Sequence, residues 1–266
     1  MDDSLIGLRV WLAGNPWRPR PAWAVVAGAL AAGAVPWHQQ DAVALLLLVF
    51  LADALWGSVW SLLGGRAAFF AGGVNGGFAS PLPYTQPGSP AARWFTWLQG
   101  PDGRAWRDGV VALAWALFLA GLVSAKALAL TGAVGILAIL SRGKATEQPL
   151  RRLAAGLVAL GLPWALGVHL FGAWGWRDLL LAASFTLLAA SIHGSVFRFG
   201  VGMAHLAMIA FLAWERLPLA AGGVGLLLWP PMLWVVQGVE SPLLLRRAGP
   251  WWLAALLASA WAIRSS

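Results

Sequence analysis

Residues 42–63 read AVALLLLVFLADALWGSVWSLL, and this stretch decides the class of fold. A helix needs about 20 apolar residues to cross the hydrocarbon core of a bilayer. The stretch is long enough, and Asp53 is its one charged residue. Because backbone groups in lipid must form hydrogen bonds within their own segment, we predict a membrane-spanning helix here.

The rest of the chain repeats this pattern and predicts an all-α polytopic membrane bundle of about nine transmembrane helices. Hydrophobic residues make up 60% of the sequence and charged residues 11%, whereas soluble domains average about 25% charged residues. Residues 1–266 are therefore expected to form a single integral membrane domain. The predicted spans are residues 22–35, 42–63, 108–125, 127–141, 153–172, 178–195, 199–214, 218–238 and 249–263.

The basic residues sort to one side of these spans. Fourteen of the eighteen Lys and Arg residues fall in the N-terminal segment and the even-numbered loops. Cytoplasmic loops are enriched in Lys and Arg, so we predict a cytoplasmic N-terminus and a C-terminus on the outer side. Residues 1–20 are expected to lie along the cytoplasmic face as an interfacial segment. The net charge of +8 then needs no nucleic-acid partner. The four residues on the outer side are Lys126, Arg177, Arg216 and Arg264.

Composition also excludes several kinds of chemistry. The chain has no Cys, which rules out disulfides, thiolate catalysis and Cys-bound metals. No Ser/His/Asp spacing or zinc-ligand set occurs. Most of the 19 Trp residues lie near predicted span ends, where the side chain anchors a helix at the membrane surface.

Residues 64–107 form a long, Gly- and Pro-rich segment that we expect to be a cytoplasmic loop. Loops of this length are either functional or lie as a structured segment on the headgroups. Residues 91–98 are predicted to form a short amphipathic helix within it. Asn75, in the stretch GGVNGGF, is a candidate ligand contact, although the stretch lacks the Lys of a phosphate-binding loop.

Nine helices, an inside N-terminus and a long loop after the second span resemble the UbiA family of intramembrane prenyltransferases. Three stretches carry the local resemblance: Ser80-Pro-Leu-Pro83, Ser141-Arg-Gly-Lys144 and Leu162-Pro-Trp164. It covers residues 20–263 and is mostly topological. The resemblance implies that an isoprenoid, quinone or pigment-type molecule binds between the helices, in an apolar cavity that opens toward the cytoplasmic loops.

The Asp-rich motifs of that family are missing here. They follow the second and sixth spans and hold the Mg²⁺ that binds a prenyl diphosphate. Residues 53–65 contain one carboxylate, Asp53, and residues 191–200 contain none. Mg²⁺ needs hard oxygen ligands, so the resemblance implies a divergent relative that would use Mg²⁺ only if transferase activity is retained.

Six polar residues are candidates for contact with a ligand. A carboxylate inside a membrane is costly and is a functional candidate by default, although it can also be a protonated packing residue. Basic groups and a His at the cytoplasmic ends of spans can bind a phosphate, or the basic groups can serve only to fix orientation. The candidates are Asp53, Asn75, Arg142, Lys144, His193 and Arg198.

The sequence also suggests roles for five other polar residues. His169 and His205 lie inside predicted spans, where they either ligate a haem or chlorophyll-type pigment or make hydrogen bonds in the packing. Glu215 and Arg216 are expected to form a solvated pair on the outer face. Lys126 is expected to extend to the outer surface.

Three functions remain open from the sequence. The first is a divergent UbiA-like protein that binds an apolar ligand, as a prenyltransferase homologue without the standard Mg²⁺-diphosphate motifs. The second is a non-enzymatic accessory subunit of a larger membrane bioenergetic or pigment complex. The third is a small transporter in which Asp53 is the coupling group.

Overall fold

The computed structural model describes residues 19–34, 38–64, 89, 93, 97–98, 100–141, 149–192, 197–239 and 241–265. Every regular element in these ranges is helical, which confirms the all-α class. In chain order they are α1 (Pro21–Ala31), α2 (Gln39–Val49), the π-helical η2 (Phe50–Trp56), α3 (Gly57–Leu63), α5 (Pro101–Val123), α6 (Ala125–Leu140), α7 (Pro149–Gly156), the π-helical η4 (Leu157–Gly161), α8 (Leu162–Phe171), α9 (Trp176–Ser191), α10 (Phe197–Trp214), α11 (Pro218–Val236) and α12 (Ser241–Arg264).

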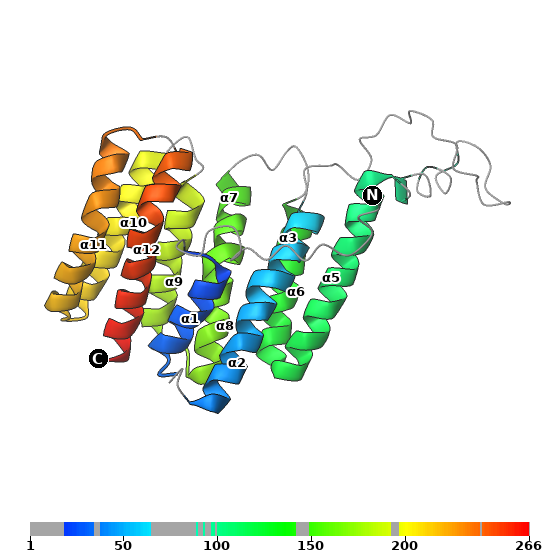
Figure 1. Cartoon of the computed structure of the whole chain (residues 1–266), viewed down its shortest axis with the longest axis horizontal. Helices are drawn as coiled ribbons and strands as arrows, with labels where there is room; N and C mark the ends of the chain where they lie inside the picture. The colour runs from blue at the N-terminus through cyan, green and yellow to red at the C-terminus, as the bar shows by residue number, and fades with distance from the viewer. Residues whose placement is uncertain are drawn as a thin grey trace.

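The helices stand side by side with roughly parallel axes, from α11 at one end of the molecule to α5 at the other (Figure 1). In the described residues, four helices are long and apolar enough to cross a membrane. They are Gln39–Leu63, Gly103–Val123, Leu150–Phe171 and Pro218–Val236, and shorter apolar helices accompany them. These helices have the length and composition that an integral membrane protein requires.

Much of the apolar surface faces outward. Only 22% of the apolar stretch in Gly103–Val123 is buried, and 28% of that in Pro218–Val236. Large exposed side chains follow these two helices, among them Trp115, Phe118 and Leu122 on α5 and Leu226 and Trp229 on α11. Soluble monomers rarely expose contiguous apolar surface of this extent, whereas a helix in lipid can be apolar all round.

Two hydrophobic cores lie along the row of helices. The large core is formed by residues of α1, η4, α8, α9, α10, α11 and α12. It includes Trp164, Phe185, Leu188, Met208, Leu212 and Trp252. The small core joins α2, η2 and α3 to α5 and α6, and includes Leu51, Trp56, Val59, Ala116, Val134 and Leu166. Helices α1 and α8 contribute to both cores because residues on opposite faces of each helix point to opposite sides.

Helices α1 and α8 pack closely against each other along the seam where the two cores meet. Gly28 of α1 and Gly167 of α8 face each other's backbone. A Cβ on Gly28 would collide with the carbonyl oxygen of Trp164, and a Cβ on Gly167 with that of Val25. Small residues allow this approach, as they commonly do between membrane helices.

Two predicted boundaries are wrong. Helix α5 begins at Pro101 instead of residue 108, so the end of the predicted 64–107 loop is helical. Helix α12 begins at Ser241 instead of residue 249, and Arg246 and Arg247 lie on it. Both errors have one cause: hydropathy detects only the part of a helix that is apolar, and a charged first turn or two can extend beyond it.

The antiparallel order of the helices places basic residues at one end of the bundle. The starts of α5, α7 and α12 and the ends of α3, α6 and α9 lie toward the upper end in Figure 1, and the start of α1 faces the same way but lies lower, about halfway down the bundle. These helix ends carry Arg20, Arg104, Arg107, Arg151, Arg152, Arg246 and Arg247. There Nη2 of Arg151 donates to the carbonyl oxygen of Gly64 over 3.2 Å, which ties α7 to the end of α3.

Candidate ligand-binding cavity

A cavity of about 240 Å³ lies beside the start of α1, in the half of the molecule that contains the large core. It is formed where the start of α1, η4, the end of α9 and the first turns of α12 meet. It is lined by Pro19, Arg20, Leu160, Leu188, Ala189, Ile192, Leu245, Gly249 and Trp252.

The cavity wall is apolar because each helix presents its buried face there. Leu188 and Ala189 are on the last turn of α9 and Ile192 is its C-cap residue, and Leu245, Gly249 and Trp252 recur at helical spacing on α12. Leu160 comes from the π-helical turn η4, which changes the helical phase between α7 and α8. Such π turns are frequent at functional sites.

Arg20 is the one charged residue among the described residues of the lining. It is the N-cap residue of α1, with extended backbone, and Pro21 occupies the first helical position. The first backbone N–H groups of a helix have no acceptor within the helix, and the helix dipole is positive at this end. A guanidinium beside a helix start therefore gives the mouth of an apolar cavity a preference for a negatively charged or carbonyl oxygen.

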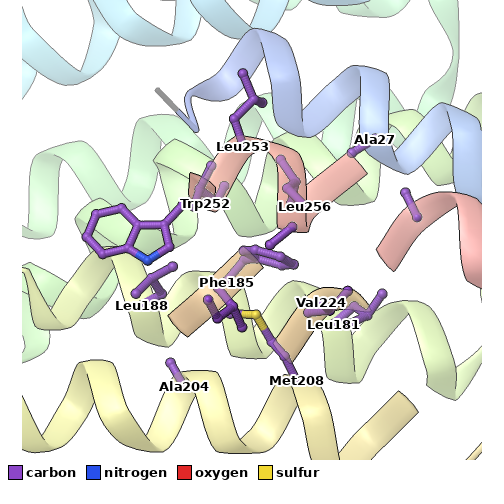
Figure 2. Packing of buried hydrophobic residues seen from close by; sticks show 14 of the residues in the cluster. Ala27, Leu181, Phe185, Leu188, Ala204, Met208, Val224, Trp252, Leu253 and Leu256 are labelled. Carbon is purple, nitrogen blue, oxygen red and sulfur yellow. The ribbon is translucent and has the colours of Figure 1, made fainter. Parts of the chain in front are cut away.

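Trp252 forms a wall of the cavity and is held from behind by a hydrogen bond. Its indole Nε1 donates to Nε2 of His205 on α10, over 2.9 Å. Figure 2 shows Trp252 reaching from α12 toward Leu188 of α9, the other large cavity side chain at this point. Because Nε2 accepts this bond, the imidazole is neutral and carries its proton on Nδ1.

His205 Nδ1 is buried and has no hydrogen-bond partner, and His205 as a residue is 4% exposed. Two further buried polar atoms of the large core, Nε1 of Trp164 and Oγ1 of Thr186, also have no partner. Leaving such a group unsatisfied costs about 1–3 kcal/mol, so each instance calls for an explanation.

The small core contains a second buried Trp with a polar partner. Nε1 of Trp56 donates to Oγ1 of Thr131 over 3.0 Å, and the Thr131 hydroxyl donates to the carbonyl oxygen of Ala127 over 2.9 Å. Trp56 belongs to η2, the same π-helical segment as Asp53. Asp53 is 3% exposed.

The structure separates the predicted contact residues. Asp53 lies beside the small core and is not part of the cavity lining. Arg198 is on the first turn of α10, and its side chain lies outside the described residues. Asn75, Arg142, Lys144 and His193 also lie outside the described residues. His193 directly follows Ile192, which lines the cavity.

The structure also places three other polar residues that the sequence singled out. His205 makes a packing hydrogen bond to Trp252, the second of its two predicted roles. His169 lies against Trp174, with ring centroids 5.2 Å apart. The prediction of a solvated Glu215–Arg216 pair is wrong. Glu215 pairs instead with Arg177 at the start of α9, with Nε and Oε2 2.6 Å apart, and its side chain is 5% exposed.

The predicted Glu215–Arg216 pair does not form because the side chains of adjacent residues need not point toward each other. Arg216 adopts a left-handed backbone conformation (φ 59°) in the turn after α10, which separates its direction from that of Glu215. Sequence reasoning also missed Arg20, Trp252 and the cavity. The charge pattern groups Arg20 with the residues that set orientation, and the distribution of Trp groups Trp252 with the membrane anchors. The one available signal was the placement of Arg20 directly before Pro21.

The described residues of the cavity do not form a Mg²⁺ site. None of the nine lining residues is a carboxylate. In the described part of the chain, no three His, Asp or Glu side chains gather as a metal site would require. Hard oxygen donors are what Mg²⁺ needs, and the cavity offers an arginine instead.

No protein family, curated protein or solved structure matches this chain. The described part of the chain is all-helical, with helices long and apolar enough to span a membrane and an apolar cavity beside the start of α1.

Proposed function

We propose that this protein is an integral membrane protein of about nine transmembrane helices that binds an isoprenoid, quinone or pigment-type molecule in the Arg20 cavity. The N-terminus is cytoplasmic and the C-terminus is on the outer side. The observation that carries the proposal is the cavity itself, which combines an apolar wall and an indole with a single guanidinium. Ligand pockets typically have apolar walls and a few polar groups that fix orientation.

The volume limits what part of the ligand is enclosed. An apolar cavity of about 150 Å³ holds benzene. A cavity of about 240 Å³ therefore takes a ring or a short branched segment, but not a long tail. In this proposal the polar head lies at Arg20, the adjoining apolar group contacts Trp252 and Leu188, and the tail extends between helices toward lipid.

The charge distribution supports the orientation. The described basic residues Arg20, Arg104, Arg107, Arg151, Arg152, Arg246 and Arg247 lie near the starts of α1, α5, α7 and α12, which face the same side of the bundle. Lys and Arg near span ends are retained in the cytoplasm, so this side of the bundle is assigned to the cytoplasm.

We also propose a UbiA-like arrangement, in a divergent form. Two features support this proposal: the succession of apolar helices along the chain and the Arg20 cavity between them. The arginine-lined, carboxylate-free cavity favours binding over Mg²⁺-dependent diphosphate chemistry. An assay for Mg²⁺-dependent diphosphate release from a prenyl diphosphate tests this part, and release that exceeds a no-protein control would contradict it.

The binding proposal is tested by purification in a mild detergent, with mass spectrometry of bound molecules and absorbance from the ultraviolet to the near infrared. We expect one apolar species with an acidic or carbonyl head. Arg20→Gln should reduce its occupancy about tenfold or more. Arg107→Gln removes the same charge from an exposed site on α5 and should leave occupancy unchanged.

Two outcomes would overturn the binding proposal. The first is equal retention by the two variants, which would place the ligand elsewhere. The second is a defined set of partner chains with pigment absorbance and no ligand in this chain, which would make the protein a subunit of a larger complex.

A second candidate function is transport, favoured by Asp53. Its carboxyl is buried in a π-helical turn in the middle of the rod Gln39–Leu63. Ionisable groups at such depth commonly belong to proton or ion pathways. Loss of proton-coupled flux in Asp53→Asn vesicles would support transport, and unchanged flux would exclude this role for Asp53.

A further inference from the structure

We propose that His205 is a positioning residue that sets the ligand selectivity of the Arg20 cavity by fixing the indole of Trp252. This inference rests on the proposed binding function. It assigns a role to a His that is not among the described lining residues but contacts one of them, Trp252.

The geometry supplies the first step. Trp252 is on α12 and His205 on α10, and their side chains meet through the 2.9 Å bond from Nε1 to Nε2. Their ring centroids are 6.3 Å apart and the ring planes are inclined by 57°. The imidazole therefore lies at the N–H edge of the indole, and the bond fixes the rotation of Trp252 about its side-chain torsions.

The second step is that this rotation determines the shape of the cavity. Trp252 has the largest side chain in the lining, and three of the other residues there, Pro19, Ala189 and Gly249, are small. A different indole rotamer would open or fill a large share of about 240 Å³. A hydrogen bond that selects one rotamer therefore selects which ligand shapes fit against Leu188 and Leu160.

The third step concerns why the acceptor for the Trp252 N–H is a histidine and not a smaller polar side chain. A neutral acceptor on any side chain could satisfy the Trp252 N–H, as the Thr131 hydroxyl does for Trp56. Imidazole adds a buried Nδ1 that has no partner. It also supplies a rigid planar ring, which restricts the direction of the bond more than a rotating hydroxyl does.

The test measures selectivity and not only affinity. Two probes share a phosphate head for Arg20 and differ in the apolar segment beside it: dodecyl phosphate, which is straight, and farnesyl phosphate, which is branched. Their Kd values are measured on the full chain in detergent for wild type, His205→Leu, His205→Gln and Trp252→Phe. His205→Gln keeps an acceptor and is the conservative control.

We expect His205→Leu to change the ratio of the two Kd values at least fivefold. Trp252→Phe should change the ratio in the same direction, and the double variant should change it no further. His205→Gln should restore most of the wild-type ratio. A role in stability alone would lower the unfolding temperature in His205→Leu but would leave the ratio within twofold of wild type, and this result would overturn the inference.

The failure of the inference and that of the proposed function are distinguishable. Binding of neither probe to wild type would contradict the proposed function and the inference with it. Binding to wild type with a ratio that His205→Leu leaves unchanged would contradict only the inference. If His205→Leu does not fold, Trp252→Phe and His205→Gln still decide, because the inference requires that only the first of these shifts the ratio.

Discussion

The two halves of the molecule use the same buried contact in different surroundings. In the small-core half, Trp56 donates to Thr131, whose hydroxyl in turn donates to a backbone carbonyl. In the large-core half, Trp252 donates to His205, whose second nitrogen is left without a partner. Trp252 also lines a cavity, and Trp56 does not line that cavity.

This difference separates a packing contact from a candidate functional one. The Trp56–Thr131 pair is fully satisfied and joins two helices, which is sufficient to explain it. Both halves contain a π-helical segment, η2 in the small-core half and η4 in the large-core half, but the large-core half also contains the arginine-lined cavity, with the unsatisfied His205 Nδ1 behind its Trp252 wall. Native proteins retain such locally unfavourable features mainly at functional sites.

The largest expected effect comes from breaking the seam that both halves share. Gly28→Leu places a side chain against the carbonyl of Trp164, where even a Cβ does not fit. We expect a loss of about 3 kcal/mol or more, or no folded protein, because backbone must move to make room. Thermal unfolding in detergent measures this.

The control is Gly222→Ala on α11, where a Cβ would meet nothing within 4 Å. Its unfolding temperature should be unchanged or slightly higher, since Ala favours helix over Gly. Equal tolerance of both substitutions would show that α1 and α8 are not closely packed.

An intermediate effect comes from removing each Trp partner. Thr131→Val and His205→Leu each leave a buried indole N–H unsatisfied, which should cost about 1–3 kcal/mol of stability. The comparison predicts a similar loss of stability in the two variants but a change in bound ligand only in His205→Leu. Stability and ligand occupancy are read from the same preparations. A change of bound ligand in Thr131→Val would contradict the prediction that only the large-core half affects ligand binding.

The smallest effect is expected at the Arg177–Glu215 pair, which joins the start of α9 to the end of α10. Arg177 is partly exposed, so solvent screens the attraction. We expect a coupling energy of about 0.5–1 kcal/mol in a double-mutant cycle with Arg177→Gln and Glu215→Gln, and no change in ligand. A coupling near zero would mean that the pair does not form.

The sequence was sufficient for the helical class and for the approximate positions of the helices. Apolar runs such as residues 42–63 and 218–238 appear as helices within a few residues of their predicted ends. The π-helical turns η2 and η4 were not predictable, since no propensity rule distinguishes them from α-helix. They arise where a helix must shift its phase to suit its neighbours.

The cavity could not be predicted because it depends on four segments that are far apart in the sequence. Arg20, Leu160, Leu188 and Trp252 have no common motif, and each has an ordinary local explanation. Asp53 was chosen for its cost in lipid, and its burial is confirmed. Burial alone does not place it at a ligand site, because helix packing and not hydropathy decides which buried groups share a cavity.

The most direct test of the central claim is photoaffinity labelling with a diazirine-bearing farnesyl phosphate, followed by peptide mapping. The account predicts that the label falls on the segments that line the cavity, at residues 188–192 of α9 and 245–252 of α12. Arg20→Gln should abolish the labelling and Arg107→Gln should not. Label that is spread over the exposed face of α5, or that persists in Arg20→Gln, would show that the cavity is not the binding site.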